Sequence, residues 1–138
     1  MILMKRMLWL ALLAALVLAG CAREGDATEE ETAMGLPAYV QITQQEAKNR
    51  MDTEDVLVLD VRRQDEFDAG HIPGAVLLPV ETITAETAAA TIPEKDTQVL
   101  VYCRSGNRSK QACDLLAKLG YTDLYEFGGI NTWPYEVE

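Results

Sequence analysis

The residues best suited to chemistry lie in one short segment that contains a cysteine and two arginines. Residues 102–109 read Tyr-Cys-Arg-Ser-Gly-Asn-Arg-Ser. This polar stretch separates an apolar run from an amphipathic one, so we expect a loop between a buried strand and a helix. Such a loop aims several backbone N–H groups at one point, and the helix dipole adds partial positive charge there. Cys103, at the start of the loop, should therefore have a lowered pKa and act as a nucleophilic thiolate.

The rest of the loop is suited to holding a small anion. Arg104 and Arg108 place positive charge beside Cys103, and clustered backbone amides also bind negative charge. The combination favours a sulfur nucleophile that attacks a small anionic substrate. We predict Cys103 as the catalytic residue, followed by a substrate-binding loop of six residues: Arg104, Ser105, Gly106, Asn107, Arg108 and Ser109.

Alternating strand and helix signals surround this loop. Apolar runs at 56–59, 76–78 and 99–102 are typical of strands buried on both faces of a parallel sheet, and shorter runs at 39–42 and 123–127 predict two more strands. Helices are expected over three ranges: 43–51, 83–91 and 109–119. This alternation predicts an α/β domain with a mainly parallel central sheet. In such a sheet, loops that follow strands lie at the carboxyl edge, where ligands bind.

Composition excludes several classes of protein. The chain has 138 residues and a formal charge of −10, enough for one domain and too short for two. Its acidity argues against a nucleic-acid partner and against binding to anionic lipid by charge alone. Three cysteines exclude a disulfide-stapled miniprotein, and with a single histidine they cannot form a four-ligand zinc site without carboxylates. The chemistry above needs no metal and no organic cofactor.

The first twenty residues have the features of an export signal. Lys5 and Arg6 precede an uncharged apolar run at 7–19, which is shorter than the roughly 20 residues of a membrane-spanning helix. The run ends in Leu-Ala-Gly-Cys at 18–21, which resembles the bacterial lipobox. The resemblance implies lipidation of Cys21 after cleavage. The alternative is an ordinary secretory signal with a chance cysteine after the cleavage site.

The segment after Cys21 is polar, acidic and without apolar periodicity, which predicts a flexible tether. We therefore divide the chain into a cleaved lipoprotein signal peptide (1–20), a lipidated cysteine with its tether (21–37) and a folded domain (38–138). The lipid anchor would make the membrane a partner. Because Ala22 is not the aspartate associated with inner-membrane retention, we expect the outer membrane, facing the periplasm, in a Gram-negative host. In a one-membrane host we expect the outer face of the cytoplasmic membrane.

The folded part resembles the rhodanese family of sulfurtransferases. Motifs of that family occur in its order along the chain: Asp60-Val61-Arg62, Glu66-Phe67, Gly70 to Ala75, Cys103 to Ser109, and Gly128-Gly129 with Trp133. The resemblance implies a rhodanese-like fold, with a five-stranded sheet and helices on both faces. It also implies that Cys103 carries sulfur as a persulfide, taken from thiosulfate or a similar donor and passed to cyanide or a thiol.

Loop length separates two chemistries known on this fold. Cys103 and Arg108 have the Cys-x₄-Arg spacing, whereas the related Cys-dependent phosphatases have one residue more and would place arginine at 109, which is Ser109 here. A shorter loop encloses a smaller ring of amides, which suits a sulfane sulfur better than a phosphate. A non-catalytic rhodanese-like binding module at the membrane and a persulfide relay to another protein's thiol remain alternatives. The oligomeric state is left open.

Four further residues have predicted supporting roles. Asp60 and Arg62 are expected to form an ion pair that orients nearby loops, although Arg62 could also touch substrate. His71 lies in a predicted turn, so we favour a structural role over a Cys-His dyad. Trp133 is expected to pack near the rim of the site.

Cys113 is the third cysteine of the chain. It lies one turn before Leu116 on the predicted helix, so we expect it to face the core as a small apolar side chain. A regulatory disulfide with Cys103 is the alternative.

Overall fold

The computed structural model describes residues 35–138. The predicted signal peptide, the predicted lipidation site Cys21 and the tether up to residue 34 lie outside the described residues. Among residues 35–138, no helix is both long enough and apolar enough to cross a membrane.

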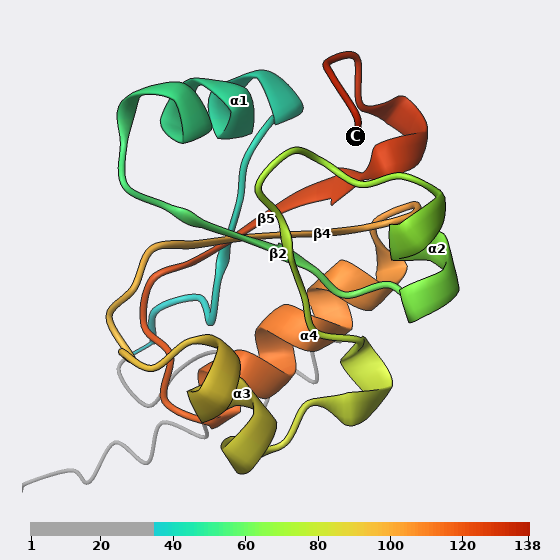
Figure 1. The fold of residues 1–138 in the computed structure, drawn as a ribbon. Helices are drawn as coiled ribbons and strands as arrows, with labels where there is room; N and C mark the ends of the chain where they lie inside the picture. Colours follow the sequence, from blue (N-terminus) through green and yellow to red (C-terminus); the bar gives the residue numbers. More distant parts are fainter. Residues whose placement is uncertain (1–34) are drawn as a thin grey trace, which may run out of the picture.

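A five-stranded sheet forms the centre of the domain (Figure 1). All of its strand pairs are parallel, and the order is β1-β5-β4-β2-β3. Its strands are β1 (Val40–Gln41), β2 (Leu57–Asp60), β3 (Val76–Leu77), β4 (Val99–Cys103) and β5 (Leu124–Gly129). The three central strands are the longest. Runs of valine and leucine in β2 and β4, and Leu124 and Phe127 in β5, are buried between the layers of helices.

Helices cover both faces of the sheet, which confirms the predicted architecture. Figure 1 shows α1 (Gln44–Thr53) on one side, with α3 (Ala85–Thr91) and α4 (Asn107–Lys118) on the other. A short α2 (Gln64–Ala69) and two 3₁₀ turns, η1 (Val80–Thr82) and η2 (Ile130–Thr132), complete the order of elements.

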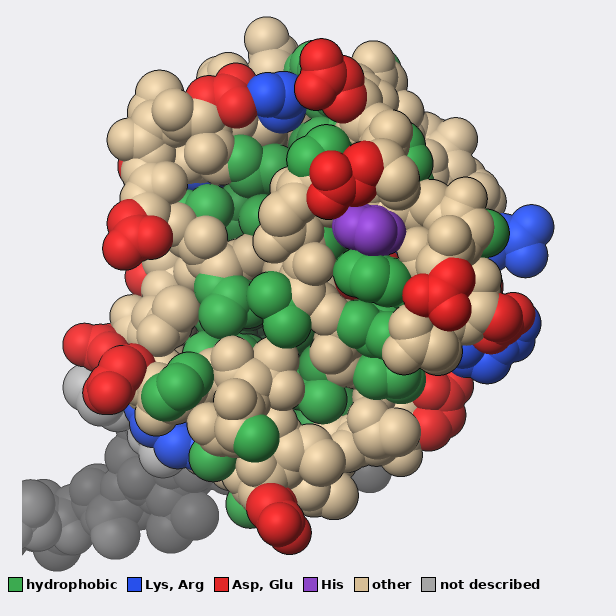
Figure 2. Space-filling model, viewed as in Figure 1, with side chains coloured by type: hydrophobic (Ala, Val, Ile, Leu, Met, Phe, Trp, Pro, Cys, Tyr) green, Lys and Arg blue, Asp and Glu red, His purple; other side chains and the backbone are tan. Residues whose placement is uncertain are grey.

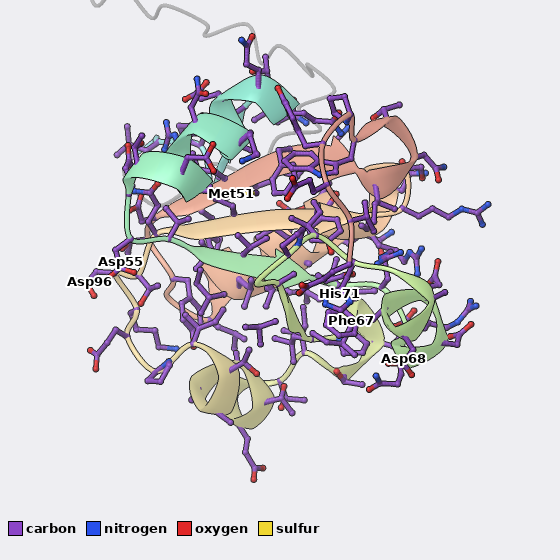
Figure 3. All side chains as sticks on the ribbon, turned by 45° about the horizontal axis from the view of Figure 1, so that its top comes forward. Met51, Asp55, Phe67, Asp68, His71 and Asp96 are labelled. Atoms are coloured by element: carbon purple, nitrogen blue, oxygen red, sulfur yellow. The ribbon has the colours of Figure 1, made fainter. Side chains whose placement is uncertain are left out.

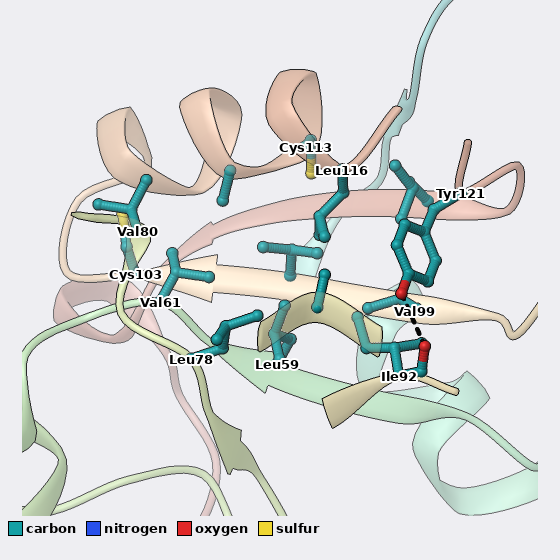
Figure 4. Packing of buried hydrophobic residues seen from close by; sticks show 14 residues of the cluster. Leu59, Val61, Leu78, Val80, Ile92, Val99, Cys103, Cys113, Leu116 and Tyr121 are labelled. Atoms are coloured by element: carbon teal, nitrogen blue, oxygen red, sulfur yellow. Dashed lines mark hydrogen bonds between the residues drawn. The ribbon is translucent and has the colours of Figure 1, made fainter. Parts of the chain in front are cut away.

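Each face of the sheet has its own apolar cluster. One lies under α3 and α4 and includes Leu59, Val101 and Leu116 (Figure 4). The other lies under α1 and includes Tyr102 and Phe127. Alternate residues of β4 contribute to opposite clusters, as the two-residue period of a strand requires. The strand that leads into the predicted loop is therefore fixed from both sides.

The two ends of the sheet differ. At the amino ends of the strands lies an open hollow of about 600 Å³, with Asp55, Asp96 and Asp123 among its lining residues. Figure 3 shows Asp55 and Asp96 at this end, with Phe67 and His71 towards the opposite end. Three carboxylates would repel an anionic substrate there. The predicted nucleophile lies at the other end, where β4 leaves the sheet.

Candidate active site

Cys103 is the last residue of β4 and lies at the carboxyl edge of the sheet. It pairs with Gly129 of β5, while the preceding Tyr102 pairs with Asp60 of β2. The register brings together the ends of three strands that carry motifs singled out from the sequence. Only 1% of Cys103 is exposed, so the sulfur lies at the base of the loop rather than on its surface.

Polar groups of the loop and of the first turn of α4 surround the sulfur. The Gly106 N–H donates to Cys103 Sγ at 3.0 Å, and the Cys103 thiol donates to Ser109 Oγ at 3.5 Å. Burial by itself would raise the pKa of the Cys103 thiol. Hydrogen bonds from the Ser109 hydroxyl and from the backbone N–H groups of Ser109, Gly106 and Ser105 outweigh that effect, and the pKa is lowered. The predicted activation of Cys103 therefore has a structural basis.

The loop reaches α4 through a left-handed residue. Gly106 has φ of +105° and stands immediately before the first helical residue, Asn107. A side chain is strained in this conformation, so glycine is favoured there. The helix begins two residues earlier than the sequence pattern suggested, because Asn107 and Arg108 continue the helical backbone without adding apolar periodicity. This brings the positive end of α4 closer to Cys103.

Strand β5 and the turn after it hold the outer side of the loop. The Asn131 N–H donates to the Arg104 carbonyl at 3.1 Å. A Cβ atom on Gly129 would overlap that same Arg104 carbonyl group. Only glycine at this position allows the loop backbone to pack against β5, which explains one half of the Gly128-Gly129 motif.

Five of the six predicted substrate-binding residues fall into two groups, and the sixth, Arg108, is half-buried. Arg104 and Ser105 are exposed on the loop, and Asn107 is exposed at the start of α4. Gly106 and Ser109 are buried, and the Ser109 hydroxyl contacts the sulfur from within the protein. The exposed group is placed to meet an arriving anion, whereas Ser109 is placed to act on the thiol.

Arg108 is already engaged in an ion pair. Its guanidinium donates to both carboxylate oxygens of Glu66 on α2, at 2.7 and 3.0 Å. This hydrogen bonding lowers the pKa of Glu66 to about 2. The pair ties α2 to the first turn of α4. It also means that Arg108 shares its charge with Glu66, so that Arg104 is the more available cation for a substrate.

Asp60 and Arg62 form the predicted ion pair, which is almost completely buried. Arg62 donates to both carboxylate oxygens of Asp60, at 3.0 and 2.7 Å, and to the carbonyl of Gly70 at 2.7 Å. The Tyr102 hydroxyl donates to Asp60 at 2.6 Å and accepts the Ile72 N–H at 3.1 Å. Burial, followed by the bond to Asp60, raises the pKa of Tyr102. These contacts fix the turn before β3. Because Arg62 donates its hydrogen bonds to Asp60 and Gly70, its role is structural.

His71 belongs to the scaffold as well. Its Nδ1 lies 3.0 Å from the Phe67 carbonyl, its Nε2 lies 3.3 Å from a Glu138 carboxylate oxygen, and its ring stacks on Phe67. Figure 2 shows it, in purple, at the surface beside acidic side chains. Both ring nitrogens have partners other than Cys103, which agrees with the predicted structural role.

The expected packing roles of Trp133 and Cys113 are confirmed. Trp133 is 9% exposed and packs against Phe127, with ring centroids 5.5 Å apart. Cys113 is fully buried on the sheet-facing side of α4 (Figure 4). Burial raises the pKa of its thiol, and the nearby Glu126 adds to this effect. Cys103 and Cys113 are both free thiols, so the alternative disulfide is not formed in this structure.

Two site residues were not assigned a role from the sequence. Glu66 was noted only as part of a motif, and nothing in its spacing from Arg108 predicted their ion pair. Glu126 was missed altogether, although it carries a signal. It shares a strand face with Leu124, two residues away, and a carboxylate on the apolar face of a strand is unusual. Among residues 35–138, no group of three or more His, Cys, Asp or Glu side chains could hold a metal ion.

Comparisons with known proteins agree with this geometry. Residues 43–135 match the rhodanese-like domain family. A sulfurtransferase of Allochromatium vinosum is 46% identical over 83 residues, which are 59% of this chain and 75% of that protein. The thiosulfate sulfurtransferase PspE of Escherichia coli is 35% identical over 72 residues, 52% of this chain and 68% of that protein.

Solved structures show the same fold. The rhodanese-like domain of an Anabaena protein has a TM-score of 0.65 and 28% identity, covering 71% of this chain and 77% of that one. An Escherichia coli rhodanese with anions has a TM-score of 0.56 and 30% identity, covering 61% of this chain and 98% of that one. The chain belongs to the rhodanese-like domain family.

Proposed function

We propose that this protein is a sulfurtransferase that moves a sulfane sulfur from thiosulfate or a similar anion to a thiophilic acceptor through a persulfide on Cys103. The observation that carries the proposal is the environment of the sulfur. A buried thiol with a lowered pKa receives a backbone N–H at 3.0 Å, at the start of a loop with exposed cationic and polar side chains. The similarity to proteins named sulfurtransferase and thiosulfate sulfurtransferase supports the same chemistry.

The first step is a displacement at sulfur. The Cys103 thiolate attacks the outer sulfur of thiosulfate, a new S–S bond forms, and the original S–S bond breaks as sulfite leaves with the electron pair. Arg104 is exposed and meets the sulfonate group of the donor. The loop amides, with Gly106 N–H nearest to the sulfur, stabilise the negative charge of the persulfide.

The second step returns the enzyme to its starting form. A nucleophile such as cyanide, or the thiol of a small molecule or another protein, attacks the outer sulfur of the persulfide. The S–S bond breaks and Cys103 leaves as a thiolate, with thiocyanate as the product when cyanide is the acceptor. The lowered pKa of Cys103 makes it both a good nucleophile in the first step and a good leaving group in the second.

The structure offers less support to the alternatives. A phosphatase of this type has a loop one residue longer, whereas Cys103 and Arg108 have the Cys-x₄-Arg spacing and position 109 is serine. A non-catalytic docking module has no need of a buried, activated thiol. We propose in addition that the domain is exported and anchored by lipid on Cys21, which a Cys21→Ser variant would test through loss of incorporated labelled palmitate.

A pair of cysteine substitutions tests the catalytic proposal. Cys103→Ser should abolish thiocyanate formation from thiosulfate and cyanide. Cys113→Ala is the matched control, because it removes the other described thiol from the same domain and should retain activity. Thiocyanate production by Cys103→Ser, or none by the parent chain with any sulfane donor, would refute the assignment.

A further inference from the structure

Glu126 is a buried carboxylate close to the nucleophile. It lies in the middle of β5, is 3% exposed, and faces the first turn of α4 rather than solvent. Burying a carboxylate is costly unless hydrogen bonds or a cation compensate. The surroundings of Glu126 therefore show what compensates for its burial and what it can do.

Three uncharged donors contact the Glu126 carboxylate. The Ser109 hydroxyl lies 2.6 Å and the Gly128 N–H 2.8 Å from Oε1, and the Gln41 side-chain amide lies 3.4 Å from Oε2. Within the part of the chain that the structure describes, no Lys, Arg or His nitrogen lies within 4.0 Å of this carboxylate. Its charge is therefore not neutralised locally by a cation.

Ser109 connects this carboxylate to the thiol. Its hydroxyl oxygen lies 2.6 Å from Glu126 Oε1, 2.9 Å from the Gly106 carbonyl oxygen and 3.5 Å from Cys103 Sγ, so Glu126 is the nearest acceptor for its proton. Ser109 is fully buried, and a hydroxyl has a single proton to donate. When that proton points to Glu126, the oxygen can accept the proton of the thiol. The three side chains then form one continuous path for a proton: Cys103 Sγ–H, Ser109 Oγ–H, Glu126 Oε1.

We propose that Glu126 accepts the thiol proton of Cys103 through Ser109, an inference that assigns a further residue to the proposed sulfur-transfer reaction and rests on it. In this step Ser109 gives its proton to Glu126 Oε1 as its oxygen takes the proton of Cys103. The Sγ–H and Oγ–H bonds break, and new Oγ–H and Oε1–H bonds form. The products are a Cys103 thiolate, a neutral Glu126 carboxyl and a Ser109 hydroxyl that donates to the thiolate.

The relay explains how a sulfur with so little exposure is activated. No proton has to pass to bulk water, and the net charge of the site is unchanged. The negative charge moves from Glu126 onto the sulfur, where the loop amides stabilise it. Glu126 is then neutral while an anionic donor approaches. After the second displacement the returning thiolate can recover its proton from Glu126 by the same path.

Other titratable and charged groups surround the relay residues. Cys113 on α4 is close enough to Glu126 for a Coulomb interaction, and burial, followed by this interaction, raises the pKa of that thiol. Arg108 on α4 interacts electrostatically with Cys103, with Glu66 on α2 and with Glu81 on η1. From β1 the contact is the uncharged amide of Gln41. Within residues 35–138, Cys103 and Glu126 are the titratable side chains hydrogen-bonded to Ser109, so neither Cys113 nor the carboxylates of Glu66 and Glu81 can replace Glu126 as the base of this path.

Alkylation of Cys103 tests the relay without any sulfur donor. The rate of iodoacetamide addition to Cys103, followed by peptide mass spectrometry, is compared in the parent chain and in Glu126→Gln between about pH 6 and about pH 9. Glutamine keeps the shape and the acceptor oxygen but takes up no proton. We expect a nearly flat profile in the parent, and in the variant a fall of about tenfold per pH unit below the thiol pKa.

Three outcomes would overturn the proposal. Faster alkylation of Glu126→Gln at low pH would show that Glu126 only repels the thiolate, because removing a nearby negative charge favours the ionised sulfur. An equal loss at every pH would indicate a structural role, and an unchanged profile would indicate no role. Glu81→Gln is the matched control, since it removes a carboxylate near Arg108 outside the relay, and it should keep the parent profile.

Ser109→Ala is a second test that does not need Glu126→Gln to fold, because it cuts the path and leaves the carboxylate in place. Its alkylation rate should show the same fall of about tenfold per pH unit below the thiol pKa. In this background Glu126 is only a nearby negative charge, so adding Glu126→Gln should leave alkylation unchanged or speed it. A flat profile for Ser109→Ala, or a further slowing in the double variant, would contradict the relay. Because alkylation needs no sulfur donor, a chain that fails to make thiocyanate can still show the relay, and the two proposals fail separately.

Discussion

Two carboxylates are buried at the carboxyl half of the sheet, and their surroundings differ. Asp60, fully buried, is held by the guanidinium of Arg62 and by the Tyr102 hydroxyl. Glu126, 3% exposed, meets a hydroxyl and two amides, and within residues 35–138 no cation lies within 4.0 Å of it. One charge is neutralised and fixed, and the other lies two hydrogen bonds from the nucleophile.

The difference indicates that Asp60 has a structural role and that Glu126 has a role in the chemistry of Cys103. A buried carboxylate bound by arginine serves as a structural counter-ion, because removing its charge would leave the arginine buried without a partner. A buried carboxylate bound by a hydroxyl can exchange a proton with it. We therefore expect substitutions at Asp60 to change stability and substitutions at Glu126 to change the pH dependence of Cys103.

The largest effect on stability is expected for Asp60→Asn. The substitution leaves the Arg62 charge buried without its partner and should lower the free energy of unfolding by about 3–5 kcal/mol. Urea unfolding followed by circular dichroism measures this. Glu126→Gln, the matched carboxylate-to-amide change, should lower the free energy of unfolding clearly less. An equal loss of stability in the two variants would show that the two carboxylates do not differ in this way.

Tyr102→Phe should have the next largest effect. It removes a hydroxyl that donates to Asp60 and accepts the Ile72 N–H, so we expect a loss of about 1–2 kcal/mol. Because this hydroxyl belongs to the Asp60 network, the shape of the pH profile for Cys103 alkylation should stay as in the parent. A profile that changed as it does for Glu126→Gln would show that the two networks are coupled.

The pair of Glu66 and Arg108 provides an intermediate case, partly buried and at the rim of the site. Hydrogen bonding to Arg108 lowers the pKa of Glu66 to about 2. A depressed carboxyl pKa stabilises the fold above the unfolded value, and this stabilisation is lost as the pH falls from about 4.5 to about 2. Glu66→Gln should lower the free energy of unfolding by about 1 kcal/mol at neutral pH. It should also make that free energy depend less on pH between about 4.5 and about 2, as measured by urea unfolding at several pH values. A pH dependence as steep as that of the parent would contradict this role of the ion pair.

The smallest effect is expected for Cys113→Ala. Its sulfur packs in the core and forms no disulfide, so its removal should cost about 1 kcal/mol, close to the value of one buried methylene group. The thermal midpoint should fall slightly while thiocyanate formation continues. Loss of activity would indicate a role for Cys113 in sulfur handling that its burial does not suggest.

The main features of the fold could be predicted from the sequence, because buried parallel strands are continuous apolar runs. The strands predicted at 56–59, 99–102 and 123–127 correspond to β2, β4 and β5, with boundaries differing by one or two residues. Helix α2 was not predicted, because it has six residues and none of them is buried. A helix without an apolar face leaves no periodic signal in the sequence.

The site could be predicted only in part. Cys103 and the loop that contains Gly106 follow from local sequence, since loop chemistry and the helix N-terminus are local features. The engagement of Arg108 by Glu66 and of Ser109 by Glu126 joins residues 42 and 17 positions apart. Such contacts depend on how α2 and β5 pack against α4. No spacing rule within a single sequence indicates them.

The most direct test of the central claim is the mass of the Cys103 peptide after the protein is incubated with thiosulfate and the excess donor is removed. We predict a gain of one sulfur atom on that peptide, its loss on addition of cyanide, and an equal amount of thiocyanate in solution. The Cys113 peptide should stay unchanged. A Cys103 peptide that gains no sulfur, or a sulfur found on Cys113 instead, would contradict the account.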